Sequence, residues 1–151
     1  GYLFWGPVGT GKSYLAACIA NALLEQEATV KMTNFNTILN DLFAAEDKTE
    51  YIRLLNGYEL LIIDDLGVER NSEYALENIF SVIDWRYQSG KPLIITTNIP
   101  LVQLKQETKI EKKRIYDRIL ERCIPVKIDG VSRREAMAND NMRTMKNILK
   151  I

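Results

Sequence analysis

An eight-residue segment near the start of the chain carries residue types suited to holding a chain of phosphates. Residues 6 to 13 read Gly-Pro-Val-Gly-Thr-Gly-Lys-Ser, a full match to the pattern G-x-x-x-x-G-K-[ST]. Glycines let such a loop curl tightly, so that successive backbone N–H groups point at phosphate oxygens. The Lys12 ammonium can then reach the β- and γ-phosphates, and the Ser13 hydroxyl can bind Mg²⁺. We therefore predict a nucleoside triphosphate site formed by Gly6, Pro7, Val8, Gly9, Thr10, Gly11, Lys12, Ser13 and Tyr14.

The sequence on both sides of this loop favours a nucleotide site over a chance glycine-rich turn. The apolar run 2–5 is strand-like, and the segment from Lys12 to about Glu27 is helical in its composition. A phosphate-binding loop of this type connects a strand to a helix. The positive N-terminal end of the predicted helix also favours an anion.

Two acidic residues follow a second hydrophobic strand. Residues 58–65 are a nearly unbroken apolar run that ends in Asp64 and Asp65, as expected for a strand buried on both faces of a parallel sheet. We predict that Asp64 belongs to the Mg²⁺ site, where it accepts a hydrogen bond from metal-bound water or from Ser13. We predict that Asp65 orients and deprotonates the water attacking the γ-phosphate. The alternative is that the two aspartates only begin a turn with Gly67.

A third strand, 91–98, ends in a neutral polar residue, Asn98. Ligands of open α/β sheets bind at the carboxyl ends of the strands. Asn98 is therefore a candidate to hold the attacking water or to sense the γ-phosphate. The alternative is a turn-forming Asn before Ile-Pro.

Strands and helices alternate along the whole chain. We expect strands at 2–5, 29–33, 58–65, 91–98 and 124–128, and helices at 12–27, 35–45, 71–89, 101–106, 111–122 and 132–149. The charged segment 46–53 is compatible with a loop or a further helix. This alternation predicts an α/β fold with a parallel sheet and right-handed crossovers.

Composition limits the class of protein. With 151 residues and 46% hydrophobic content, the chain is expected to form one domain over 1–151. It contains no run of 18 apolar residues and no signal peptide, which predicts a soluble, cytoplasmic protein without a membrane partner. Cys18 and Cys123 are expected to be reduced core thiols. The absence of histidine excludes histidine-based acid–base catalysis and histidine-ligated metals.

Charge is unevenly distributed although the net charge is zero. Residues 1–104 carry 7 Lys and Arg against 13 Asp and Glu, whereas residues 105–151 carry 13 against 7. The basic C-terminal third could bind a phosphate-rich partner or the acidic face of a neighbouring copy. The alternative is a set of solvated helix faces.

Four segments together resemble a known family. Residues 6–13, Ile62–Gly67, Ile95–Asn98 and Arg114–Ile119 occur in the order of Walker A, Walker B, sensor 1 and box VII of AAA+ ATPases. The sequences of these motifs are most similar to those of the DnaC/DnaI helicase loaders, and IstB-like transposition ATPases are closely related. The resemblance implies a P-loop NTPase with a five-stranded parallel sheet flanked by helices, and ATP/ADP and Mg²⁺ as cofactors.

The resemblance also implies a function and partners. It implies a homo-oligomer with ATP sites between subunits, which hydrolyses ATP and loads a replicative DNA helicase onto single-stranded DNA. Arg118 would be the arginine finger that acts on the neighbouring subunit's ATP, with Arg114 as a supporting basic residue. A planar guanidinium suits phosphate, and the two residues share a helix face. The alternative is a solvated helix surface paired with nearby acids.

Three features depart from the family pattern. Most AAA+ proteins have Glu where this chain has Asp65, whose shorter side chain still permits the activation of water. Few residues follow the last predicted strand, so the helical lid is expected to be absent or vestigial, and Arg133 or Arg134 are only weak sensor 2 candidates. The chain also starts almost inside its first strand, so we expect a fragment that lacks an N-terminal helicase-binding region.

Other functions are compatible with the same motifs. An IstB-like transposition ATPase would differ in its partner and not in its chemistry. A small-molecule kinase shares the P-loop, but it needs an acceptor pocket and usually an arginine-rich lid. A module that binds ATP without hydrolysing it is compatible with the shorter arm of Asp65.

Overall fold

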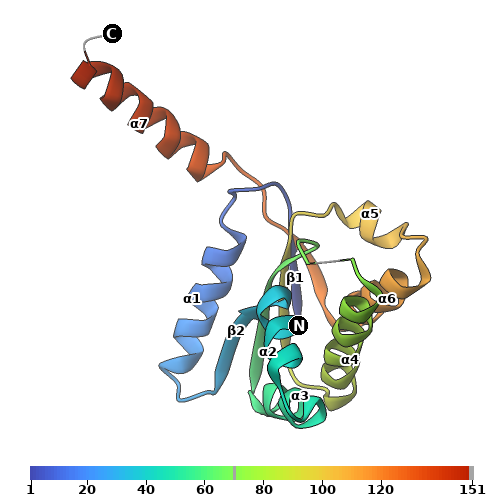
Figure 1. The fold of residues 1–151 in the computed structure, drawn as a ribbon. Coiled ribbons are helices and arrows are strands. Elements are labelled where there is room, and N and C mark those ends of the chain that lie inside the picture. The colour runs from blue at the N-terminus through green and yellow to red at the C-terminus, as the bar shows by residue number, and fades with distance from the viewer. Residues whose placement is uncertain (70, 150–151) are drawn as a thin grey trace.

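In the residues that the computed structural model describes, five strands are separated by one or two helices each, and the seventh helix follows the last strand (Figure 1). The structure describes residues 1–69 and 71–149, and the side chains of these residues except 133–136, 147 and 149. The strands are β1 (Tyr2–Trp5), β2 (Val30–Asn34), β3 (Leu60–Leu66), β4 (Leu93–Thr97) and β5 (Ile124–Lys127). The helices are α1 (Lys12–Leu24), α2 (Phe35–Ala44), α3 (Lys48–Gly57), α4 (Glu73–Ser89), α5 (Leu101–Lys105), α6 (Ile110–Arg122) and α7 (Arg133–Leu149).

The strands form one parallel sheet in the order β2-β3-β4-β1-β5. Leu3 of β1 is in register with Ile95 of β4 on one side and with Pro125 of β5 on the other. Since all strands run in the same direction, the residues that follow β1, β3 and β4 lie at the same edge of the sheet. The predicted parallel α/β sheet is confirmed.

Helices cover both faces of the sheet. Helix α1 packs on one face, while α2, α3, α4 and α6 pack on the other (Figure 1). Strand β3 contributes alternate residues to the two sides: Leu61 and Ile63 join the larger core cluster, and Leu60 and Ile62 join the cluster with Ala16 of α1. Because both faces are covered, this strand needs the continuous apolar run seen in the sequence.

Most element boundaries follow local capping signals. The Thr37 N–H donates to Asn34 Oδ1 at 2.9 Å, and the Ala75 N–H donates to Ser72 Oγ at 3.1 Å. Gly90 ends α4 in the left-handed conformation, directly after residue 89, where the sequence predicts the end of this helix. The charged segment after residue 45 is a helix, α3, because the Glu50 N–H donates to Asp47 Oδ1 at 3.0 Å and caps it.

Several boundaries differ from the prediction by one to three residues, among them those of α1 and β3. Helix α1 ends at Leu24, three residues earlier than expected, and Glu27 has a positive φ of 63° in the turn that follows. Strand β3 begins at Leu60, because Tyr58 ends α3 and the Glu59 carboxylate accepts the Thr29 N–H at 2.7 Å. The turn at Glu27 therefore shortens α1, and the contact between Thr29 and Glu59 delays the start of β3.

The two cysteines lie in different environments. Cys123 is buried, and burial raises the pKa of its thiol to about 11, so that it is a protonated core thiol. Cys18 is exposed, and the prediction that it lies in the core was wrong. Ala16 and Ala20 form the buried stripe of α1, and Cys18 lies on the other side of the helix.

Helix α7 extends away from the rest of the domain (Figure 1). In the described part of the chain it is the only helix after β5. The sensor 2 candidates Arg133 and Arg134 begin this helix, but their side chains lie outside the described residues. None of the helices in the described ranges combines the length and apolar sequence that a bilayer span requires.

Candidate nucleotide-binding site

The glycine-rich segment forms the predicted loop between β1 and α1. Gly11 precedes the first residue of α1 and has a φ of 95°, a conformation that residues with a side chain rarely adopt. A Cβ atom at Gly11 would meet no other atom within 4 Å, so this position borders open space. A Cβ atom at Gly9 would collide with the Ser132 side chain, because the segment after β5 crosses the loop there.

The lysine of the motif is held under the loop. Lys12 is 5% exposed, and its Nζ donates to the carbonyl oxygens of Gly6 at 2.9 Å and Pro7 at 2.6 Å. The Thr10 hydroxyl also donates to the Pro7 carbonyl, at 3.0 Å. The loop therefore keeps an ammonium group at its centre, close to the backbone that would face a phosphate.

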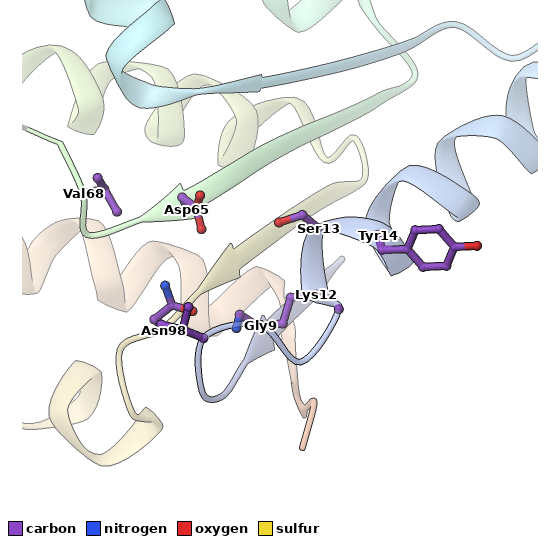
Figure 2. A pocket seen from close by; sticks show the side chains of 9 residues that line it. Gly9, Lys12, Ser13, Tyr14, Asp65, Val68 and Asn98 are labelled. Carbon is purple, nitrogen blue, oxygen red and sulfur yellow. The ribbon is translucent and has the colours of Figure 1, made fainter. Parts of the chain in front are cut away.

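A pocket of about 290 Å³ brings most of the predicted site residues together (Figure 2). Ser13, Asp65 and Asn98 come from α1, β3 and the end of β4, and they line the same pocket as Lys12. In the figure the Tyr14 ring points away from Asp65 and Asn98, and Tyr14 is 67% exposed. The complete lining is Val8, Gly9, Gly11, Lys12, Ser13, Tyr14, Asp65, Val68 and Asn98.

Val68 is the lining residue that sequence reasoning missed. It follows the second acidic motif in the loop after β3 and is 64% exposed. Its aliphatic side chain carries no chemical signal that marks it as a site residue. Only its position close after the two aspartates in the sequence could have suggested it.

The two aspartates lie at an irregularity in the sheet. Ile63 pairs with Ile95, but Leu66 pairs with Thr97, so that two residues of β3 stand opposite the single residue Thr96 of β4. Asp65 has a φ of 57°, in the left-handed region. The Asp65 side chain lies on the side of the phosphate-binding loop (Figure 2).

Asp64 lies differently from Asp65. It does not line the pocket of the phosphate-binding loop but borders an adjoining one of about 350 Å³ beside the start of α2. Its Oδ1 accepts a hydrogen bond from the Thr96 hydroxyl at 2.5 Å. The remaining residues of the adjoining pocket are Asn34, Phe35, Asn36, Thr37, Asn40, Asp65, Val68 and Glu69.

No group of three or more Asp, Glu or Cys side chains in the described ranges is arranged to enclose a metal ion. This fits the chemistry of Mg²⁺ in nucleotide sites, because Mg²⁺ is usually held by one or two protein groups together with phosphates and waters. Ser13 and the aspartates of β3 are groups of the appropriate kind.

The two arginines singled out on α6 lie away from the phosphate-binding loop. Arg118 Nε donates to Asp84 Oδ1 of α4 at 2.8 Å, and the guanidinium lies 4.5 Å from the centroid of the Tyr87 ring. The Arg114 guanidinium lies 4.3 Å from the centroid of the Phe80 ring. Neither residue lines the pocket of the phosphate-binding loop.

Comparison with known proteins supports these observations. Residues 2–140 match the model of the family described as IstB-like ATP binding protein. The chain is 31% identical over 123 residues to the replicative helicase loader DnaC of Escherichia coli strain K12, covering 78% of this chain and 49% of that protein. It is 34% identical over 101 residues to a putative insertion sequence ATP-binding protein of Sinorhizobium fredii, covering 65% of this chain and 34% of that protein.

The fold is also found among solved structures. The crystal structure of DnaI superposes with a TM-score of 0.73 at 26% identity, over 87% of this chain and 72% of that chain. The predicted AAA+ P-loop fold, with a five-stranded parallel sheet between helices, is therefore confirmed. The chain spans about half the length of the DnaC protein that it matches. By its sequence over residues 2–140, by its fold and by its nucleotide-binding loop, this chain belongs to the IstB-like ATP-binding protein family, which is related to the DnaC/DnaI helicase loaders.

Proposed function

We propose that this chain is the ATPase core of a helicase-loader-type protein, which binds ATP with Mg²⁺ and hydrolyses the terminal phosphate. The observation that carries this proposal is the meeting of Lys12, Ser13, Asp65 and Asn98 in one pocket, although they come from three separate motifs. A loop that only binds phosphate does not need an acid and an amide facing it. An ATPase needs both, because a water molecule must be oriented and deprotonated.

The residues of the pocket suit the phosphates of ATP. Gly11 faces open space in front of the N-terminus of α1, where backbone N–H groups and the helix dipole favour an anion. Lys12 would neutralise negative charge on the β- and γ-phosphates, and Ser13 and Asp64 would hold Mg²⁺. Bound Mg²⁺ would supply electrostatic stabilisation of the phosphate oxygens.

Two residues would act on the attacking water. The Asp65 carboxylate would accept a proton from it, and the Asn98 amide would fix its orientation or contact the γ-phosphate. Asn98 is exposed and follows β4 directly, in a turn where the Ile99 N–H donates to the Thr97 hydroxyl at 3.1 Å. This turn holds the amide at the edge of the pocket.

A complete site would need a second subunit. Among the described residues that line the pocket, Lys12 is the only cation. In NTPases of this type, an arginine near the γ-phosphate strongly accelerates hydrolysis. We therefore assign Arg118 to the ATP site of a neighbouring subunit, with Arg114 in a supporting role on the same face of α6. Arg118 is 38% exposed, so that a neighbouring molecule could reach it.

The names of the relatives support the choice of partners. The related DnaC protein is a replicative helicase loader, so we propose a replicative helicase and single-stranded DNA as the partners of the parent protein, acting in the cytoplasm. A second candidate is a transposition ATPase, which the related insertion sequence protein favours. Co-purification of the full-length protein with a replicative helicase or with a transposase distinguishes the two.

Hydrolysis itself is tested by phosphate release in the absence of any added acceptor. We expect the full chain with Mg²⁺ to release phosphate from ATP, and the Lys12→Ala variant to release it about 10²- to 10³-fold more slowly, because one preorganised charge at the phosphates is lost. Transfer of phosphate only to an added small molecule would instead identify a kinase. Tight ATP binding without phosphate release would identify a binding module.

Binding to single-stranded DNA is expected to weaken steeply with salt. Residues 105–151 carry 13 Lys and Arg against 7 Asp and Glu, and contacts between such residues and phosphates release counterions. The measurement is the affinity for a fluorescent oligonucleotide between about 50 and 200 mM salt, over which several phosphate contacts cost about 10-fold or more. An affinity independent of salt would contradict this role for the basic segment.

A further inference from the structure

A buried hydroxyl lies beside the irregular part of β3 that contains the two aspartates. Thr96 is fully buried in β4, directly opposite the irregular part of β3. Its hydroxyl donates to Asp64 Oδ1 at 2.5 Å and accepts the Asp65 N–H at 2.9 Å. One side-chain oxygen of a neighbouring strand thus contacts both acidic residues.

The two contacts use the hydroxyl in its two possible roles. A threonine hydroxyl has one proton to donate, and here this proton is directed to the Asp64 carboxylate. The same oxygen accepts a hydrogen bond from the N–H of Asp65, which has a left-handed φ of 57°. That N–H lies at the register shift between Ile63 and Leu66, where the regular ladder of hydrogen bonds is interrupted.

The irregular backbone decides where the Asp65 side chain points. In a regular strand, successive side chains point to opposite faces of the sheet. Here an extra residue and a left-handed φ direct Asp65 to the pocket of the phosphate-binding loop (Figure 2). Such a conformation persists only where the surroundings hold it, and the hydrogen bond to Thr96 is a contact that holds it.

We propose that Thr96 is a positioning residue for ATP hydrolysis, which sets the orientation of the Asp64 carboxylate for Mg²⁺ and the backbone of Asp65 for contact with water. This inference rests on the proposed ATPase function. Thr96 touches neither nucleotide nor water in this role and acts through the two aspartates. It is not among the residues that line the pocket.

Thr97 offers a matched control within the same strand. It is also fully buried, and its hydroxyl donates to the Leu66 carbonyl at 2.7 Å and accepts the Ile99 N–H at 3.1 Å. The Thr97 hydroxyl therefore also makes two hydrogen bonds, one to β3 and one within the turn after β4, and neither involves an acidic residue. Replacing either threonine by valine keeps the shape and removes the hydroxyl.

The test compares Thr96→Val, Thr96→Ser and Thr97→Val with the unmodified full chain. We expect Thr96→Val to bind ATP normally without Mg²⁺, to need more Mg²⁺ for half-maximal activity and to lose about 10- to 100-fold in kcat, the usual effect of removing a group that orients a metal ligand. Thr96→Ser should recover most of this loss. Thr97→Val should lose similar thermal stability and keep the Mg²⁺ dependence of the unmodified chain.

An equal rise in the Mg²⁺ requirement of the two valine variants would overturn the proposal, because it would show that the contact of Thr96 with Asp64 has no specific effect on the metal site. Failure of serine to restore activity would also overturn it. If the unmodified chain does not hydrolyse ATP, the proposed ATPase function fails independently. The Mg²⁺ dependence of ATP affinity then still tests Thr96, and an unchanged dependence in Thr96→Val would refute its role.

Discussion

Replacing Arg118 with alanine should leave ATP binding intact and lower ATP hydrolysis in the assembled protein by about 10³- to 10⁵-fold, the range known for arginine fingers. The physical reason is that a guanidinium neutralises charge that develops on the phosphate oxygens only during the reaction. Arg118 does not line its own pocket, so its removal should not disturb ground-state binding. The measurement pairs the affinity for a fluorescent ATP analogue with the rate of phosphate release.

Mixing two inactive variants tests whether Arg118 acts between subunits. The partner variant is Asp65→Asn, because Asn tolerates the left-handed φ of this position and removes the base. In an equal mixture that assembles at random, about one quarter of the interfaces combine an intact pocket with an intact arginine. Activity should therefore return to a measurable fraction of the unmodified rate, whereas no recovery would argue that Arg118 acts elsewhere.

Arg122→Ala is the control for this experiment. Arg122 lies one turn after Arg118 on α6, and its guanidinium is 5.9 Å from the centroid of the same Tyr87 ring. It contacts the same aromatic surface but is not proposed to reach the ATP of a neighbour. If Arg122→Ala were as inactive as Arg118→Ala, the loss would come from disturbed packing of α6 on α4.

The residues with chemical motifs were predictable because their positions follow from the strand order of a parallel sheet. Lys12, Asp65 and Asn98 follow or end three strands, and strand ends of a parallel sheet converge at one edge. The apolar run before Asp64 predicted a strand covered on both faces, which the structure confirms. The end of α4 at Ser89 agrees with the predicted range 71–89, whereas its start lies at Glu73, after the cap Ser72.

The features that escaped prediction depend on contacts between distant segments. The register shift at Asp64 and Asp65 requires Thr96 of another strand, and nothing in the local pattern of β3 marks it. The crossing of the phosphate-binding loop by the segment that contains Ser132 is likewise a tertiary contact. The helical start at Asp47 could have been found, since Glu50 follows Asp47 at the spacing of a helix cap.

Arg86 is the clearest example of a residue whose role depends on contacts between distant segments. In the sequence it is one more charged residue in the amphipathic helix α4, yet in the structure it is 1% exposed. Its guanidinium donates to the carbonyl oxygens of Asn56, Tyr58, Glu59 and Pro92, at distances from 2.6 to 3.4 Å. It thereby joins α4 to the segments that lead into β3 and β4. Burial lowers the pKa of Arg86 to about 10, so the group is still charged at neutral pH.

Arg86→Met should therefore lower the free energy of unfolding by about 3–4 kcal/mol, because several buried carbonyls lose their donor while the aliphatic volume is largely kept. For a domain of this size the midpoint of thermal unfolding would fall by about 10 °C. Arg86→Lys should recover part of the loss, since an ammonium keeps the charge but cannot reach all the carbonyls. Denaturant and thermal unfolding followed by circular dichroism measure both.

Lys91→Met is the matched control for Arg86. Lys91 Nζ donates to two carbonyls at the end of α3, those of Asn56 at 3.0 Å and Gly57 at 2.9 Å, and the first of these also accepts from Arg86. Because Lys91 is partly solvated, water can replace its donors, and the loss should be about 1 kcal/mol or less. If Arg86→Met and Lys91→Met lowered the free energy of unfolding equally, the buried guanidinium would contribute no more to stability than the partly solvated ammonium. A much larger effect of Arg86→Met would identify that guanidinium as the group that holds together the segments preceding β3, which carries the two aspartates, and β4, which leads to Asn98.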